Sequence, residues 1–320
     1  MSVKKYQNLQ AKEEYERITG DLSCLPVSFC YDGRVYKGLG GLEQVSSEKT
    51  ECAGKECRVF VLKADKNLNI TLDTAYYDSH GAFEWTVWFK NAGTENTGII
   101  KDVYAADMFF CGESATLKGI YGDHENFYKP YEYPLEGKPV NFMSDKGRPT
   151  HIYFPYFNLE YGDGGALMAI GWGGTWNASF TYSDKKTRFT AQSTNNLATY
   201  LKPGEKIRTA LISILPYTVR DENYATNLWR SWYLEHNIPK ANARGDALTP
   251  LSTCCFANDT GLPNSDGSIS ERHYTWKPSV EKMLKEDIHP DFRWVDAGWY
   301  SDPEGNTIES NWWGDRKSVV

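Results

Sequence analysis

Apolar and polar residues alternate over most of this chain, with the two-residue period of strands that have one buried face. The clearest case is the segment 83–90, where the apolar set is Phe83, Trp85, Val87 and Phe89. This pattern predicts a strand with one face in a core.

Similar segments recur between residues 23 and 217, separated by clusters of Gly, Asn and Asp. A turn at 91–96 leads into an apolar stretch at 97–110, and we expect the segments 83–90 and 97–110 to pair antiparallel. The other predicted strands are 27–31, 35–39, 59–63, 69–76, 150–158, 166–172, 176–182, 187–191 and 206–217. Strands in this number without helices between them predict a mainly β fold, a large two-sheet antiparallel sandwich.

The pattern becomes helical after Tyr217. Asp221 is a suitable N-cap for a helix that runs to about His236, and Pro239 ends it. An apolar stripe at a four-residue spacing is expected to pack this helix on the sandwich: Tyr224, Leu228 and Trp232. We therefore assign residues 1–238 to one domain, the sandwich with its exit helix.

Residues 239–320 follow a different order of elements. A linker at 239–249 precedes a short apolar strand at 251–256, a helix at 277–287 and a second short strand at 292–295. Strand, loop, helix and strand in this order predict a parallel crossover unit, which has no counterpart in the sandwich. We therefore assign these residues to a second domain.

Composition excludes several classes of function. Lys and Arg number 35 against 42 Asp and Glu, so the net charge of −7 argues against a nucleic-acid partner. The longest apolar runs, 165–170 and 210–215, are far too short to cross a bilayer, and the first residues lack the apolar region of a signal peptide. We expect no membrane partner and a cytoplasmic protein.

The seven cysteines are an odd number at scattered positions, which indicates reduced thiols rather than a disulfide framework. Cys52 and Cys57 have no second cysteine pair or histidine pair near them in sequence, so we expect no zinc site there. Aromatic residues make up 14% of the chain. Their flat faces suit core packing first, but also the C–H faces of sugars, so composition is a weak indication of carbohydrate binding.

A candidate site follows the second short strand. In parallel α/β sheets the functional groups lie at the carboxyl ends of strands, and Asp296 comes directly after the segment 292–295. Gly298 permits a tight exit that brings Trp299 beside this carboxylate. An acid next to an aromatic ring can hold sugar hydroxyls while the ring covers the apolar face of the sugar. The alternative interpretation is that Asp296 caps a loop or a helix.

The stretch from Asp296 to Tyr300 resembles the Asp-Asp-Gly-Trp-Phe-like motif at the second barrel strand of the retaining α-galactosidases of glycoside hydrolase family 36. Three further segments, 84–93, 171–176 and 227–239, are similar to the N-terminal sandwich and exit helix of that family. The resemblance covers nearly the whole chain. It implies an N-terminal β-supersandwich that leads into an incomplete (β/α)8 barrel.

Two positions depart from the family pattern. In the family, the two Asp residues of the motif together bind galactose hydroxyls. The second Asp is replaced by Ala297 here, so the binding role is carried over to Asp296 only. The family's Thr-Trp-Glu-Ala-like stretch is replaced by Thr253-Cys-Cys-Phe256, which lacks the Trp that walls the sugar pocket. The identity of the glycoside therefore stays open.

The family's catalytic carboxylates are expected beyond this chain. A full barrel takes roughly 250 residues, whereas only 70 follow Pro250. A Lys-x-Asp sequence, Lys63-Ala-Asp65, lies in the sandwich and is interpreted as a coincidence. The final stretch 315–320 also departs from the family and is compatible with a truncation.

For the complete enzyme the resemblance implies a double displacement by two carboxylates, without a metal or organic cofactor. Asp296 would bind substrate hydroxyls, Trp299 would line the pocket, and the partner would be an oligosaccharide or other glycoside. We expect no catalytic residue in this chain, no activity of the chain alone, and self-association of a half-built barrel. The resemblance also allows a homo-oligomer.

Two interpretations stay open beside these. Trp172 and Trp176 lie in a Gly-rich turn that could reach a neighbouring barrel, although a structural turn is the favoured interpretation. The alternative function is that of a non-catalytic carbohydrate-binding or oligomerisation module built on the sandwich.

Overall fold

The computed structural model describes residues 3–52, 54–123, 126–194, 197–242, 244–248, 253–255 and 276–294. The chain divides into two compact units, Met1–Ile238 and Pro239–Val320.

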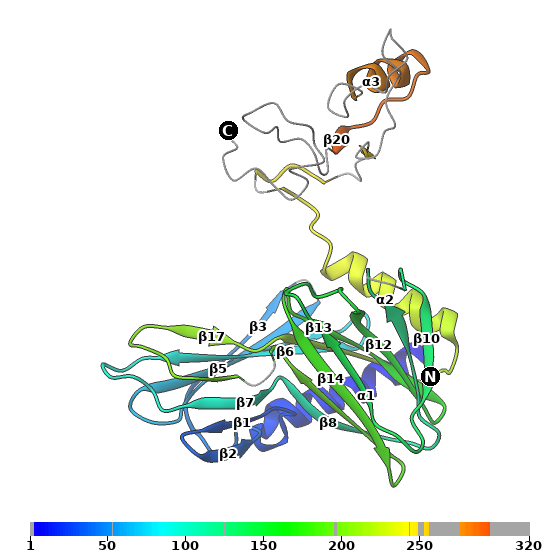
Figure 1. Ribbon diagram of the computed structural model, residues 1–320. Coiled ribbons are helices and arrows are strands. Elements are labelled where there is room, and N and C mark those ends of the chain that lie inside the picture. Colours follow the sequence, from blue (N-terminus) through cyan, green and yellow to red (C-terminus); the bar gives the residue numbers. More distant parts are fainter. Residues whose placement is uncertain are drawn as a thin grey trace. The chain divides into compact units, whose positions relative to one another are not determined.

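The first unit contains a ten-stranded antiparallel sheet (Figure 1). Its order is β10-β9-β12-β13-β18-β6-β5-β4-β3, and β17 also pairs with β6. The strands are β3 (Glu43–Cys52), β4 (Lys55–Lys63), β5 (Leu68–Tyr77), β6 (Ala82–Asn91), β9 (Thr116–Tyr121), β10 (Pro130–Pro134), β12 (Tyr153–Tyr161), β13 (Gly164–Gly171), β17 (Lys206–Arg208) and β18 (Leu211–Tyr217).

Two four-stranded antiparallel sheets cover one face of this large sheet, and together they form the second layer of the sandwich. One has the order β16-β7-β1-β2, with β1 (Ser28–Tyr31), β2 (Arg34–Lys37), β7 (Ile100–Tyr104) and β16 (Ala198–Thr199). The other has the order β11-β14-β15-β8, with β8 (Ala106–Cys111), β11 (Val140–Ser144), β14 (Trp176–Ser183) and β15 (Lys186–Gln192). The predicted mainly β, antiparallel sandwich is confirmed.

Aromatic side chains fill the space between the two layers. Phe29 of β1 meets Phe89 of β6 edge-on at 5.2 Å between ring centroids, and Phe157 of β12 meets Phe180 of β14 at the same distance. The predicted inward face of β6 is buried throughout. Glu84 on its opposite face is buried as well, because a helix covers that side of the sheet.

The predicted pairing of 83–90 with 97–110 is wrong. Both edges of β6 are occupied, by β5 on one side and by β18 and β17 on the other. The stretch 97–110 instead crosses to the second layer and divides at Ala105 into β7 and β8, which belong to different small sheets. Ala105 is fully buried, and its N–H donates to the carbonyl of Ala191 in β15.

An N-terminal helix, α1 (Val3–Gly20), was not predicted from the sequence pattern. It packs on the inner face of the large sheet through a narrow stripe of Ala11, Tyr15 and Ile18. The Tyr15 ring stacks on Tyr76 at 5.4 Å, and its hydroxyl lies 3.0 Å from Oγ1 of Thr74. A short 3-10 turn, η1 (Leu22–Cys24), connects this helix to the strands.

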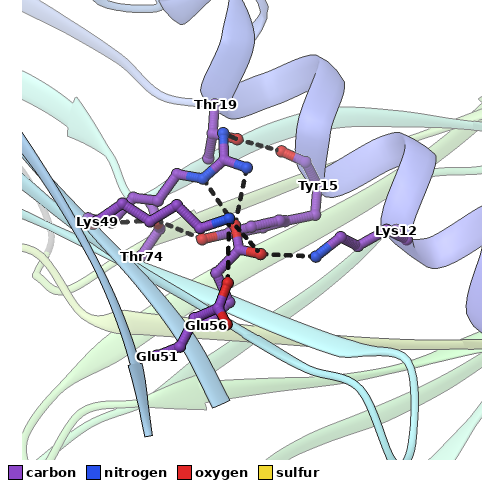
Figure 2. Close-up of polar contacts among 8 residues, drawn as sticks. Lys12, Tyr15, Thr19, Lys49, Glu51, Glu56 and Thr74 are labelled. Carbon is purple, nitrogen blue, oxygen red and sulfur yellow. Dashed lines mark hydrogen bonds and ion pairs between the residues drawn. The ribbon is translucent and has the colours of Figure 1, made fainter. Parts of the chain in front are cut away.

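A buried carboxylate joins α1 to the sheet (Figure 2). Glu56 of β4 accepts hydrogen bonds from Lys12 of α1 at 2.7 Å and from Arg58 at 2.8 Å, and Lys49 of β3 lies 3.2 Å away. Arg58 in turn donates to Oγ1 of Thr19 at 3.0 Å. Burial alone would raise the pKa of Glu56, but the hydrogen bonds from Lys12, Arg58 and Lys49 outweigh it and lower the pKa to about 2.

The exit helix α2 (Glu222–His236) is confirmed. The Asp221 side chain accepts from the N–H of Tyr224 at 3.0 Å, which is the expected N-cap bond. Leu228 and Trp232 are buried against the outer face of the large sheet, and the Trp232 ring meets Tyr77 edge-on at 5.5 Å. The predicted packing of this helix on the sandwich is therefore correct.

The second unit contains β19 (Thr253–Cys255), α3 (Trp276–Lys285) and β20 (Phe292–Trp294). The two strands pair in parallel, with Cys254 opposite Arg293. The predicted crossover unit is confirmed in its order and its direction. Closure of such units into a barrel stays a prediction.

Two general features concern the described residues only. Four cysteines there are not part of a disulfide: Cys24, Cys30, Cys57 and Cys111. In that part of the chain no helix combines the length and the apolar character that a membrane span would need.

Candidate functional site

The carboxyl ends of β19 and β20 form the first candidate site. Because the strands are parallel, Cys255 and Trp294 lie opposite each other at the same edge of the pair. This is the edge at which α/β proteins place their functional groups. The two residues predicted to bind the sugar, Asp296 and Trp299, lie outside the described residues, and so does Ala297. Their roles therefore stay predictions.

A groove on the outer face of the ten-stranded sheet is the second candidate. It has a volume of about 490 Å³ and lies between α2 and the strands β9, β10, β12 and β13. Tyr156 of β12 and Trp229 of α2 face each other with ring centroids 5.8 Å apart and ring planes tilted by 59°. The alternation of β12 sends Tyr156 to the outer face, whereas Phe157 points into the core.

The polar groups of the groove are held by ion pairs and hydrogen bonds. Nζ of Lys118 lies 3.1 Å from Oε1 of Glu160 and 3.6 Å from Oε2 of Glu222. Burial lowers the pKa of Lys118, but the carboxylate of Glu160 outweighs this and raises it. Oδ1 of Asn158 accepts from the hydroxyl of Tyr217 at 2.6 Å.

Tyr156 stays protonated at neutral pH, because burial, followed by the proximity of Tyr233, raises its pKa to about 12. Its hydroxyl is therefore a hydrogen-bond donor. An aromatic pair beside fixed polar groups can stack on a sugar ring and hold its hydroxyls. Lys118 and Arg220 both pair with the buried carboxylate of Glu160, an arrangement that suits binding better than proton transfer.

Sequence reasoning missed this groove. Its walls come from β12 and α2, more than sixty residues apart, and their approach depends on the tertiary fold. The available signal was the alternation that places Tyr156, Asn158 and Glu160 on one face of β12.

Both tryptophans of the Gly-rich turn contact other residues of the same unit. Trp176 is fully buried, and its Nε1 donates to the carbonyl of Pro149 at 2.7 Å. Trp172 is half-buried, and the guanidinium of Arg208 lies 5.0 Å from its ring centroid. The structural interpretation of this turn is confirmed for Trp176.

The Lys63-Ala-Asp65 sequence is also structural. Asp65 accepts from the hydroxyl of Tyr31 at 2.6 Å and from the N–H groups of Asn67 and Leu68 at 2.7 and 2.8 Å. Burial raises the pKa of Asp65, but these hydrogen bonds outweigh it and lower the pKa. The carboxylate therefore organises the turn before β5, a structural role that agrees with the interpretation given to this sequence.

Comparison with protein-family models and with curated proteins found no match. Solved structures do match. An α-galactosidase from Lactobacillus brevis has a TM-score of 0.66 at 11% identity, over 87% of this chain and 39% of its own. A GH36 α-galactosidase from Geobacillus stearothermophilus has a TM-score of 0.62 at 13% identity, over 86% and 39%.

The galactosidase domain of an α-galactosidase-sucrose kinase matches less closely, with a TM-score of 0.56 at 14% identity over 74% of this chain and 35% of its own. Further matching structures of a Geobacillus stearothermophilus GH36 α-galactosidase are complexes with raffinose and stachyose. The chain thus spans well under half the length of these proteins. At these identities the likeness concerns the fold alone, and this chain has the fold of the N-terminal region of GH36 α-galactosidases.

Proposed function

We propose that this chain is the N-terminal part of a retaining glycoside hydrolase that acts on terminal α-galactosides. The observation that carries the proposal is the order of its parts: an antiparallel sandwich, an exit helix, and then a parallel strand-helix-strand unit. Solved structures that share this fold include α-galactosidases.

In this proposal the chain supplies part of the sugar pocket and neither catalytic carboxylate. Asp296 accepts hydrogen bonds from sugar hydroxyls, and the ring of Trp299 covers the apolar face of the sugar. A retaining hydrolase needs a nucleophile and an acid/base carboxyl group about 5 Å apart. We assign neither role to the 320 residues.

Two assays test this proposal. The chain is expected to release no aryl alcohol from an aryl α-galactoside, and to bind raffinose weakly in a calorimetric titration. Asp296→Asn should weaken raffinose binding by about tenfold or more, because a charge-assisted hydrogen bond contributes roughly 1.5–3 kcal/mol. The matched control is Asp287→Asn, which changes an exposed carboxylate of the same unit and should bind like the wild type. Turnover by the chain alone would contradict the assignment.

A second function, non-catalytic carbohydrate binding, is favoured by the aromatic groove of the first unit. Under this alternative the variant Trp229→Ala loses raffinose binding, Trp229→Phe retains a ring and much of the affinity, and Asp296→Asn has no effect. Leu234→Ala is the control, because this residue is exposed on the same helix. Unchanged binding in Trp229→Ala would eliminate the groove as a sugar site.

A further inference from the structure

A cluster of two histidines and a glutamate lies where α2 ends against the sheet. His80 belongs to the turn between β5 and β6, whereas Glu235 and His236 are the last two residues of α2. The ligand atoms of these three side chains all lie within 4.8 Å of one another. No role in the proposed function uses this cluster.

The distances suit one metal ion between the three side chains. Nε2 of His236 lies 3.4 Å from Oε1 of Glu235, and Nε2 of His80 lies 3.9 Å from Oε2 of the same carboxylate. Two ligands of a tetrahedral Zn²⁺ with bonds of about 2.0–2.1 Å lie roughly 3.3–3.5 Å apart. The Glu235 side chain is half-exposed and long, so its carboxylate can move slightly toward His80 and shorten the longer of the two distances.

The orientation of His80 also suits a ligand. Its ring is buried, and Nδ1 lies 2.7 Å from Oγ of Ser79. When Nδ1 donates its proton to that hydroxyl, Nε2 carries a lone pair toward Glu235. Oγ of Ser231 lies 3.0 Å from the same Nε2, and Oγ of Ser79 lies 3.3 Å from Nε2 of His236, so a bound ion takes over lone pairs that these hydroxyls contact in the metal-free chain.

The rings of the cluster also pack, since the His236 ring lies 4.5 Å from the Tyr77 ring and meets His80 edge-on at 5.7 Å. Neutral imidazoles are good ligands for zinc-type ions, and the adjacent carboxylate supplies negative charge.

We propose that His80, Glu235 and His236 bind a divalent ion of the zinc type and that the ion fastens the end of α2 to the β5–β6 turn. Three protein ligands and water complete a four-coordinate site. The role is structural, because the ion joins two elements of the first unit. It has no part in the sugar binding proposed for Asp296.

Titration of the metal-free 320-residue chain with Zn²⁺ and Co²⁺ tests the proposal. We expect one equivalent of Zn²⁺ to bind and to raise the thermal midpoint, and bound Co²⁺ to give the intense visible absorption of a four-coordinate site. Glu235→Gln should weaken binding by about tenfold or more, and Ser79→Ala by about tenfold through the orientation of His80.

The matched control is Glu222→Gln in the first turn of the same helix, which should bind both ions like the wild type. Glu235 is half-exposed, so its variant is expected to fold, which circular dichroism verifies. Equal affinity of Glu235→Gln and wild type, or a Co²⁺ spectrum identical to that of the aqueous ion, would overturn the proposal.

Discussion

Replacement of Glu56 by Gln tests the link between α1 and the sheet. The substitution keeps the shape of the side chain and removes its charge, so Lys12 and Arg58 face a neutral amide. The pKa of Glu56 falls from an ordinary value of 4.5 to about 2 in the folded chain. One pKa unit corresponds to about 1.4 kcal/mol, so the carboxylate contributes about 3 kcal/mol to folding at neutral pH. Two of its cationic partners are partly exposed to solvent, which reduces the expected loss to about 2–3 kcal/mol.

The sign of the pH dependence follows from the lowered pKa. The stabilisation by Glu56 is present above its unfolded pKa of about 4.5 and is lost as the pH falls through the folded pKa of about 2. Wild type and Glu56→Gln should therefore differ at pH 7, and the difference should shrink by about half at pH 3. Urea titrations at the two pH values, followed by circular dichroism, measure both quantities.

The control for this experiment is Glu51→Gln, in the same cluster (Figure 2). Glu51 is exposed and contacts Lys49 alone among the charged residues of the cluster, at 3.2 Å. An exposed pair contributes little, so this variant should lose less than about 0.5 kcal/mol. Equal losses for the two variants, or a Glu56→Gln loss that does not change with pH, would show that the charge of Glu56 does not hold α1 to the sheet.

Two further substitutions test separate contacts. Tyr15→Phe removes the buried hydroxyl that lies beside Oγ1 of Thr74. Because Thr74 keeps the hydrogen bond that it donates to the carbonyl of Arg58, the free energy of unfolding in urea titrations should fall by only about 1 kcal/mol. No measurable loss would contradict this. Asp221→Ala removes the N-cap bond to Tyr224 and should cost about 1 kcal/mol. Asp221→Asn should recover most of that loss, and failure to do so would show that the cap is not the cause.

The parts predictable from sequence are those whose apolar residues recur with a regular period. In β6 they recur at every second position because one face of the strand meets a continuous aromatic core, and α2 combines an N-cap with a stripe that ends in Trp232. In contrast, the buried apolar residues that the structure describes in α1 are Ala11, Tyr15 and Ile18, and most of the residues around them in sequence are polar. The edge strand β3 is mostly exposed, so its residues carry no alternation at all.

Other features depend on tertiary contacts that periodicity does not record. The division of 97–110 into two strands occurs at Ala105, whose small side chain fits between the layers. The sugar-site residues Asp296 and Trp299 rest on the carboxyl-end rule and on the family resemblance, and they stay predictions. The parallel direction of β19 and β20, on which the rule depends, is confirmed.

A crystal structure of this chain soaked with raffinose would show where the sugar binds. We expect density for the galactosyl group at the carboxyl ends of β19 and β20, with a sugar hydroxyl within hydrogen-bond distance of Asp296. Sugar density only in the groove beside Trp229, or Asp296 buried away from solvent and sugar, would contradict this expectation.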